Sequence, residues 1–211
     1  GNIMFCRVNP QKVMLMKQAK VLTDQELKRV LVMCEAMQNG KRNRIAVLLS
    51  HYAGLRVGEI ASLKWRDLLK PNATIKEQFW LKAEHTKSNE ARAVHLNGRL
   101  QRELRAWKSC LSQLSIDAPV IPSQKRSKRY QNDLGHFSAN SLCQLFARIY
   151  RAAGIDGATS HSGRRWFITR LAHSGISPKV IMTLAGHKNL TTTQRYIDVN
   201  DEMLVKAVEG L

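Results

Sequence analysis

The sequence predicts a mainly α-helical fold with a small antiparallel β-sheet, in the α+β class. Apolar residues recur at helical spacing through most of the 211-residue chain, whereas residues 78–96 alternate like two paired strands. The length suits one hydrophobic core, and a hydrophobic content of 44% is that of a folded globule. No apolar run approaches the roughly 20 residues that cross a bilayer, and no signal-peptide pattern opens the chain. We therefore expect a cytoplasmic protein with no membrane contact.

The chain divides into three predicted parts. Residues 1–20 are mixed and basic, and we expect an N-terminal arm or interdomain linker there, with residues 1–3 resembling a cloning remnant ahead of Met4. Residues 21–199 carry the regular helix and strand patterns and form the predicted main domain. Residues 200–211 carry an apolar stripe at helical spacing and predict a C-terminal helix.

The first helices are indicated by their caps. "TDQE" at 23–26 is a capping box, in which Thr23 caps the helix and Glu26 reaches back, and Gly40 is expected to end that helix. A second apolar helix is predicted from Ile45 to Ala53, after the basic run "KRNR" at 41–44. A short helix is expected through "RVGEIASLKW" at 56–65.

The pattern changes to β in the middle of the chain. Residues 78–85 and 91–96 are β-prone, and the polar "TKSNE" between them predicts the turn of a hairpin. A helix is expected over 98–114, and residues 118–137 are expected to form a basic loop. The remaining predicted helices run from a Ser138 cap to Ala153, from a Ser160 cap to His173, from Ser177-Pro178 to Gly186, and around 191–197 and 201–209.

The net charge indicates a polyanionic partner. The chain has 34 Lys and Arg against 16 Asp and Glu, a formal charge of +18. Nucleic acid explains this excess best, ahead of an anionic membrane surface or a merely solvated basic surface. The following basic residues are candidates for contacts with a DNA backbone: Lys41, Arg42, Arg44, Lys125, Arg126, Lys128, Arg129, Arg165 and Arg195.

The cysteines do not form a metal-binding pattern. Cys6, Cys34, Cys110 and Cys143 are scattered, and no CxxC pair occurs. They are expected to be reduced, buried thiols, and no metal site is predicted.

Six residues on five predicted elements could form one reactive site. They are Arg56, Lys87, His161, Arg164, His187 and Tyr196. Taken singly, each has an ordinary explanation: Arg56 could pair with Glu59, Lys87 could be a solvated turn residue, and either histidine could cap a helix or bond a carbonyl. His161 and Arg164 are three residues apart at a predicted helix start and so share a face.

Four motifs in register resemble the catalytic domain of the tyrosine recombinases, or phage-type integrases. "GLRxGEIxxLxWxD" matches residues 54–67, "TK…R.V.L" matches 86–96, "HxxRR" matches 161–165, and "LxGHxxxxTTxxY" matches 184–196. The similarity extends from about residue 20 to 200. One departure is Gly163, where the family often has an aliphatic residue; a glycine there is expected to loosen the start of its helix.

The resemblance implies a site-specific recombinase or integrase and assigns each of the six residues a role. Tyr196 would attack the scissile phosphate, giving a 3′-phosphotyrosyl intermediate and a free 5′-hydroxyl. Arg56 and Arg164 would hold the charged oxygens, with His187 adding a hydrogen bond. Lys87 would protonate the leaving 5′-oxygen, His161 would accept the phenol proton, and Glu59 would orient Arg56. The chemistry would use no metal, ATP or other cofactor.

The resemblance also implies partners and an architecture. Four subunits would assemble on two sites of double-stranded DNA and exchange strands through a Holliday junction, while the free protein would be a monomer of prokaryotic, phage or mobile-element origin. The C-terminal helix could dock on a neighbouring subunit or on its own domain. The short N-terminal segment fits either an excised fragment or a minimal recombinase. Two other functions stay open: a non-catalytic DNA-binding regulator on this scaffold, and a type IB topoisomerase.

Overall fold

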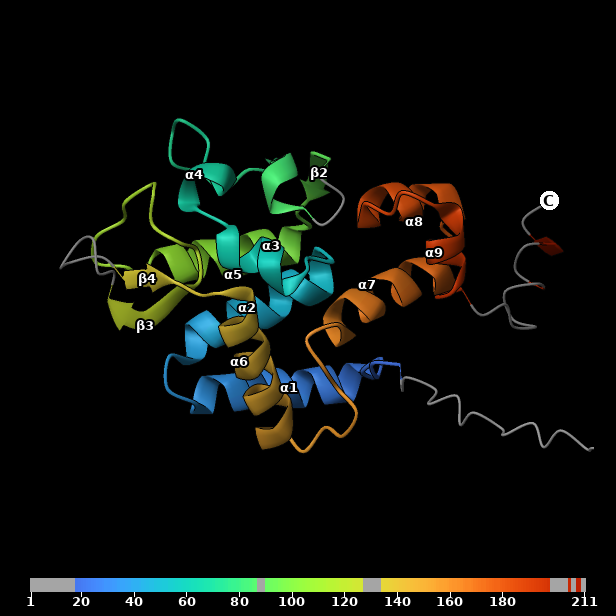
Figure 1. Cartoon of the computed structure of the whole chain (residues 1–211), viewed down its shortest axis with the longest axis horizontal. Coiled ribbons are helices and arrows are strands. Elements are labelled where there is room, and N and C mark those ends of the chain that lie inside the picture. Colours follow the sequence, from blue (N-terminus) through green and yellow to red (C-terminus); the bar gives the residue numbers. More distant parts are fainter. Residues whose placement is uncertain (1–17, 87–89, 127–133, 198–204, 206–207, 210–211) are drawn as a thin grey trace, which may run out of the picture.

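The computed structural model describes residues 18–86, 90–126, 134–197, 205 and 208–209, and it confirms the predicted mainly helical class with small antiparallel sheets (Figure 1). The elements described in chain order are α1 (Asp24–Ala36), α2 (Gly40–Tyr52), α3 (Val57–Ser62), α4 (Trp65–Leu68), β1 (Gln78–Leu81), the 3-10 turn η1 (Ala83–His85), β2 (Arg92–His95), α5 (Gly98–Lys108), β3 (Pro122–Arg126), β4 (Leu134–His136), α6 (Ala139–Ala152), α7 (Ser162–His173), α8 (Pro178–Ala185) and α9 (Leu190–Gln194).

Helix α1 begins as predicted but ends earlier. The Thr23 Oγ1 accepts a hydrogen bond from the Glu26 N–H at 3.1 Å, and the Glu26 Oε2 accepts one from the Thr23 N–H at 2.9 Å, which confirms the capping box. The expected stop at Gly40 is wrong, because Asn39 makes the left-handed turn at φ 59° and Gly40 is the first residue of α2. A Cβ on Gly40 would lie 2.6 Å from the Cys34 carbonyl oxygen, so this glycine allows the two helices to meet closely.

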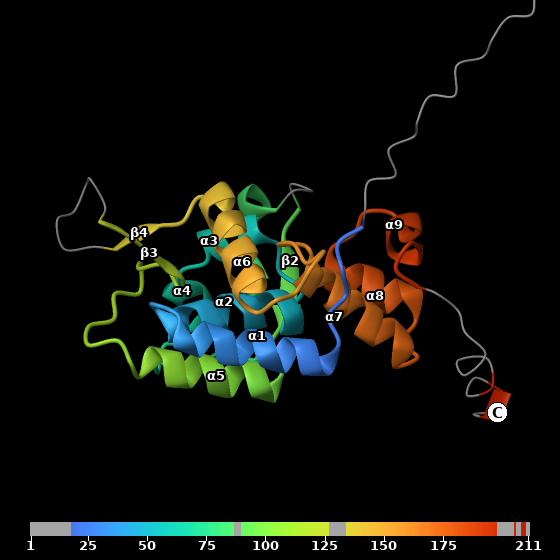
Figure 2. The ribbon, with the colours of Figure 1, turned by 90° about the horizontal axis from the view of Figure 1, so that it is seen from below.

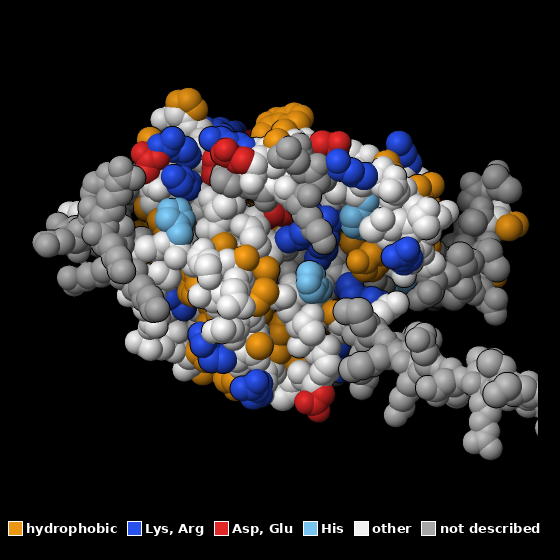
Figure 3. Space-filling model, viewed as in Figure 1, with side chains coloured by type: hydrophobic (Ala, Val, Ile, Leu, Met, Phe, Trp, Pro, Cys, Tyr) orange, Lys and Arg blue, Asp and Glu red, His pale blue; other side chains and the backbone are white. Residues whose placement is uncertain are grey.

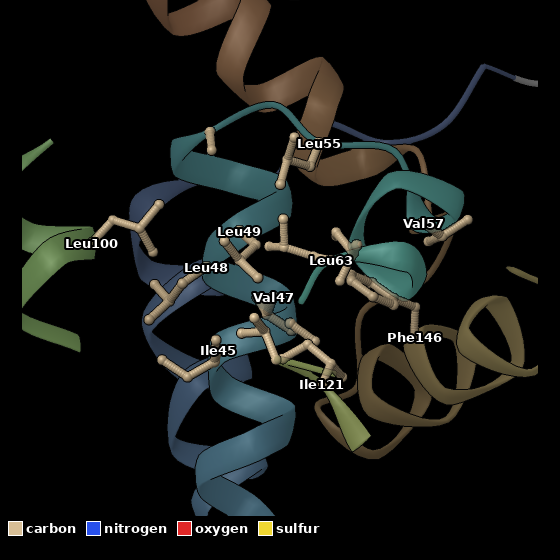
Figure 4. Close-up of a cluster of buried hydrophobic side chains, with 14 of the residues drawn as sticks. Ile45, Val47, Leu48, Leu49, Leu55, Val57, Leu63, Leu100, Ile121 and Phe146 are labelled. Carbon is tan, nitrogen blue, oxygen red and sulfur yellow. The ribbon is translucent and has the colours of Figure 1, made fainter. Parts of the chain in front are cut away.

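Helix α2 forms the centre of the core. It starts five residues before the predicted Ile45, so the "KRNR" run lies inside its first turns. The helix packs against α1, α5 and α7, and residues 45–51 are all buried. A helix covered on every side reads as a continuous apolar run, which is the pattern seen in this segment. Figure 4 shows Val47, Leu48 and Leu49 of α2 among side chains from α5, α6 and the segment before β3.

The predicted hairpin is present. Strands β1 and β2 pair in antiparallel register, with Phe79 opposite Val94 and Trp80 opposite Ala93. Phe79 and Val94 are buried, whereas Trp80 is 62% exposed, so one face of the hairpin packs on the core and the other faces solvent. β2 also contacts α8, which brings this hairpin next to the C-terminal helices.

Several expected boundaries are wrong. Residues 118–137 were expected to be a loop, but β3 and β4 form a second antiparallel hairpin there, with Pro122 opposite His136. Its basic, polar sequence lacks the apolar alternation that predicts strands. Helix α5 ends at Lys108 rather than at residue 114, and the short helix over 56–65 is two helices, α3 and α4.

Helix α7 joins the main core to a second, smaller one. The buried members of the smaller core are Ile168, Ala172, Ile181 and Ala185, which lie on α7 and α8. Figures 1 and 2 both show α8 and α9 beside each other at one end of the molecule, next to α7. The predicted end of α8 is confirmed, because Gly186 takes the left-handed conformation at φ 64°.

Gly163 allows α7 to pack closely on α2. A Cβ at this position would lie 2.4 Å from the Ser50 Oγ and 2.8 Å from the His51 Nδ1. The residue expected to loosen the start of α7 therefore marks a tight contact. The predicted Ser160 cap is also wrong, because His161 occupies the N-cap position.

Replacing Gly163 with alanine is expected to destabilise the protein by about 1–3 kcal/mol, since the new methyl group would push against α2. The measurement is the free energy of unfolding from a urea titration. Gly58→Ala is the matched control: its Cβ would meet the Ala139 Cβ at an ordinary 3.9 Å, so stability should stay level or rise slightly. Equal values for the two variants would contradict the packing argument.

Two predicted segments lie largely outside the described residues. They are the N-terminal arm over 1–20, of which only 18–20 are described, and the C-terminal helix over 200–211, of which only 205, 208 and 209 are described. In the described ranges, no helix combines the length and the apolar character that crossing a membrane would need.

Candidate active site

A buried carboxylate organises one side of the candidate site. Glu59 lies in the first turn of α3 and is 1% exposed. Its Oε1 accepts a hydrogen bond from the Arg56 Nη1 at 2.9 Å, and its Oε2 accepts one from the Arg56 backbone N–H at 2.8 Å. The Arg56 side chain keeps 23% exposure. Glu59 therefore fixes both the backbone and the guanidinium of Arg56, as the ion-pair interpretation of Arg56 required.

Arg164 holds two turns of the chain together. It lies in the first turn of α7 and is 5% exposed. Its Nη1 donates to the Gly54 carbonyl at 2.7 Å, and its Nη2 donates to the Ala185 carbonyl. Burial, and then the charge of Arg56, lower the pKa of Arg164 to about 9, which leaves it charged at neutral pH. The acceptors in the described part of the chain take two of its five N–H donors, one from each terminal nitrogen.

A second buried arginine, for which the sequence predicted no role, joins this group. Arg92, the first residue of β2, is 8% exposed, and its Nη2 donates to the Glu59 Oε2 at 2.9 Å. Its Nη1 donates to the Leu184 carbonyl at 3.0 Å. The available signal was the "R" of the "TK…R.V.L" motif, a charged residue at an inward-facing strand position.

His187 and Tyr196 face each other at the ends of α8 and α9. Their ring centroids are 5.9 Å apart and nearly parallel, at 22°. The His187 Nδ1 lies 2.9 Å from the hydroxyl of buried Thr193, and the Arg165 guanidinium lies 5.3 Å from the Tyr196 ring centroid. Burial, and then Arg164, Arg56 and Arg92, lower the pKa of His187 to about 4. His187 is therefore neutral at pH 7.

The structure brings four of the six predicted reactive residues into one cluster. Arg56, Arg164, His187 and Tyr196 interact directly or through their charges, although they come from the N-cap of α3, from α7 and from the segments that follow α8 and α9. His161 is exposed at the N-cap of α7, three residues before the buried Arg164. Lys87 lies outside the described residues.

The cluster is strongly positive. The Glu59 carboxylate bonds to the guanidinium groups of Arg56 and Arg92, and it interacts with Arg164 through charge. In Figure 3, Lys, Arg and His side chains gather near the middle of the face shown, in the region where Figure 1 places α3, β2, α7 and α8. Nowhere in the described ranges do three His, Cys, Asp or Glu side chains group as metal ligands. The arrangement can bind an oxyanion and concentrate hydrogen-bond donors on it.

Two of the candidate DNA-contacting residues have other partners. Arg42 is 6% exposed; its Nη1 donates to the Pro122 carbonyl at 3.0 Å, and its guanidinium lies over the Phe137 ring. Arg44 pairs with Glu35 and Glu103. The expectation for Arg42 is therefore wrong, because packing against β3 covers it.

For the other candidate DNA-contacting residues, the structure describes the side chain, only the backbone, or neither. Lys41 and Arg195 are exposed, and Arg165 is partly buried. Lys128 and Arg129 lie outside the described residues, and for Lys125 and Arg126 only the backbone, in β3, is described.

The cysteines are less uniform than expected. Cys34 is buried, and burial raises the pKa of its thiol to about 12. Cys143 is only partly buried, and Cys110 is exposed with its Sγ 3.0 Å from the Lys41 Nζ. The expectation of a buried thiol is therefore wrong for Cys110. Cys6 lies outside the described residues.

A buried histidine below the site predicts acid sensitivity. His51 is fully buried beside Gly163, its Nδ1–H donates to the Val47 carbonyl at 2.9 Å, and burial lowers its pKa to about 4. The unfolded chain binds a proton here near pH 6.5, whereas the folded chain stays neutral down to about pH 4. Between these values the unfolded state holds more protons, so the free energy of unfolding falls as the pH falls.

We therefore expect His51→Gln to flatten the pH dependence of stability between pH 6.5 and 4.5. In the wild type this one histidine contributes a slope of at most about 1.4 kcal/mol per pH unit. Urea titrations across this range give the slope. His173→Gln, an exposed histidine at the end of α7, is the control and should keep the wild-type slope. His187, whose pKa is also lowered to about 4, should keep its own share of the slope, so an unchanged total slope in His51→Gln would contradict the role given to His51.

Comparisons with known proteins agree with this geometry. The model of the phage integrase family matches residues 20–203. The chain is 32% identical over 203 residues to tyrosine recombinase XerA of Thermococcus kodakarensis, covering 96% of this chain and 66% of the relative. It is 30% identical over 191 residues to XerA of Pyrococcus furiosus, covering 90% and 61%. The chain thus spans less than two thirds of the length of these relatives.

Solved structures share the fold. A crystal structure of XerA recombinase superposes with a TM-score of 0.68 at 22% identity, covering 96% of this chain and 66% of that one. XerH recombinase, solved after cleavage on its palindromic difH substrate, gives a TM-score of 0.64 at 21% identity, covering 89% and 51%. A Tn1549 transposon integrase in complex with a circular intermediate DNA gives 0.67 at 19% identity, covering 92% and 66%.

Proposed function

We propose, since this chain belongs to the phage integrase family, that it is a site-specific recombinase that breaks and rejoins DNA strands through Tyr196. The observation that carries this proposal is the convergence of Arg56, Arg164, His187 and Tyr196 on one positive cluster around a buried carboxylate. Among the described residues, three arginines interact with one buried carboxylate in this cluster, and a phosphodiester would supply further negative charge.

The proposed reaction exchanges one phosphoester for another. The Tyr196 Oη attacks phosphorus, the bond from phosphorus to the 5′-oxygen breaks, and a 3′-phosphotyrosine remains. The phenol proton passes to His161, and Lys87 gives a proton to the departing 5′-oxygen. Attack by a 5′-hydroxyl of another strand reverses these steps, so rejoining needs no external energy source.

The two arginines would stabilise the charge that develops on the phosphate oxygens. Arg164 is fixed by the Gly54 and Ala185 carbonyls, and Arg56 by Glu59, so both are oriented before DNA binds. Fixed donors of this kind are each worth about 3–4 kcal/mol of transition-state stabilisation. A neutral His187, held at Thr193, would add a hydrogen bond without further crowding of positive charge.

The proposed partner is double-stranded DNA carrying specific recombination sites, with four subunits assembled on two sites. The charge of +18 supports a polyanion, and two of the solved relatives were in complex with DNA. Among the residues whose side chains are described, we propose that Lys41, Arg165 and Arg195 contact the DNA backbone. The proposed location is the cytoplasm, where such DNA is found.

Covalent capture tests this function. The chain is incubated with a pool of DNA duplexes that have a randomised core and a nick beside it, so that a cleaved strand loses its short end and cannot be rejoined. Complexes that survive denaturing detergent are sequenced to define the site, and the attached residue is identified by mass spectrometry. We expect an adduct on Tyr196. DNA binding without any adduct would favour a non-catalytic regulator, and relaxation of supercoiled plasmid by the monomer would favour a topoisomerase.

A further inference from the structure

We propose that Arg92 is a positioning residue of this site, which acts by holding Glu59 and the end of α8 in one arrangement; the inference rests on the proposed function. Arg92 lies on the hairpin strand β2, whereas its two partners lie on α3 and α8. One guanidinium thus connects three elements that are distant in sequence.

Each partner of Arg92 leads directly to a residue of the candidate site. Glu59 makes two hydrogen bonds to Arg56, so a shift of its carboxylate would move the Arg56 guanidinium. Leu184 precedes Ala185, whose carbonyl accepts from Arg164, and lies three residues before His187. Arg92 therefore fixes the separation between the part of the site that carries Arg56 and the part that carries His187.

The turn after α8 packs directly on the stem of Arg92. A Cβ on Gly186 would lie 2.3 Å from the Arg92 Cδ and 2.8 Å from its Nε. This contact leaves neither group room to move toward the other. Together with the two hydrogen bonds, it holds the residue before His187 against β2.

Arg92 cannot easily serve as a phosphate contact itself. It is 8% exposed, and its Nε is buried with no partner in the described part of the chain. Its two terminal nitrogens are aimed at protein acceptors on different elements, an arrangement that needs the planar fork of arginine. A lysine could reach only one of these acceptors.

The test compares cleavage of a normal phosphate with cleavage of a methylphosphonate, both placed at the scissile position of a nicked duplex identified as above. The methylphosphonate lacks one charged oxygen, so cleavage of it depends less on a correctly oriented arginine. For Arg92→Gln we expect slower adduct formation on phosphate and a ratio of phosphate to methylphosphonate rates at least about tenfold below that of the wild type. Arg92→Lys should show a smaller shift in the same direction.

The controls separate positioning from folding and from the proposed function. Arg105→Gln, an exposed arginine on α5, should leave both rates unchanged. A loss of folded protein slows both substrates equally, so an unchanged ratio in Arg92→Gln, or in Arg92→Lys if the glutamine variant unfolds, overturns the inference. If the wild type forms no adduct at all, the proposed function fails. If the wild type forms the adduct and the Arg92 variants keep its rate ratio, the proposed function stands and only the inference about Arg92 fails.

Discussion

Replacing Tyr196 with phenylalanine is expected to reduce covalent capture of DNA by at least about 1,000-fold, because the attacking oxygen is lost. The phenylalanine ring keeps its stacking on His187 and its contact with Arg165, so the fold and DNA affinity should be preserved. The measurements are the rate of adduct formation on the nicked duplex and the dissociation constant for the same DNA. Affinity should change by less than about threefold.

The matched control for Tyr196→Phe is Tyr52→Phe. The Tyr52 hydroxyl accepts a hydrogen bond from Arg99 at 2.7 Å and is not part of the cluster, so this variant should form the adduct normally. Tyr150 is an unsuitable nucleophile, because it is 1% exposed and burial raises the pKa of its phenol. An adduct that persists in Tyr196→Phe would mean that another side chain attacks.

Replacing Glu59 with glutamine is expected to destabilise the protein by about 3–5 kcal/mol, the usual cost of removing one partner from a buried ion pair. Glu59 is the shared anion for Arg56 and Arg92, and a neutral amide would leave both guanidinium groups without a counter-charge. The N–H donors of the glutamine amide would also face N–H donors of a guanidinium group, and two donors cannot form a hydrogen bond. Adduct formation should fall with stability, because Arg56 loses its fixed orientation.

Urea titration measures the first effect, and the capture assay measures the second. Glu77→Gln is the control: Glu77 is 69% exposed and pairs with Lys70, so its loss should change stability far less. If the free energy of unfolding of Glu59→Gln lies within about 1 kcal/mol of the wild-type value, the Glu59 carboxylate contributes no more to stability than an exposed ion pair does. In that case water or a bound anion must compensate the arginines.

The parts of the fold that could be predicted from sequence depend on local chemistry. The Thr23 capping box, the Ser138 cap and the stop at Gly186 follow from bonds within one turn of chain, and the structure contains all three. The second hairpin was missed because its strands are polar and are held by backbone pairing, which leaves no apolar pattern. Gly40 was misplaced because its role depends on how closely α1 approaches α2.

The candidate site could not be predicted from local chemistry, because its residues are far apart in the sequence. Spacing alone could not join Arg56 to Arg164, since 108 positions separate them in the numbering; the resemblance to a family supplied that connection. Arg42 and Arg92 show the remaining difficulty. Both are arginines in basic or alternating segments, and only the neighbours that pack on them make one a support for β3 and the other a link between α3 and α8.

The bonds of Arg164 connect two hydrophobic cores of different size. Its guanidinium joins the Gly54 carbonyl, in the large core, to the Ala185 carbonyl, in the small one. The small core has four buried members among the described residues. A small core opens locally at a lower free energy than a large one. Warming should therefore detach α8 and α9 first, and the proposed adduct formation would be lost at a temperature where most of the helices are still folded.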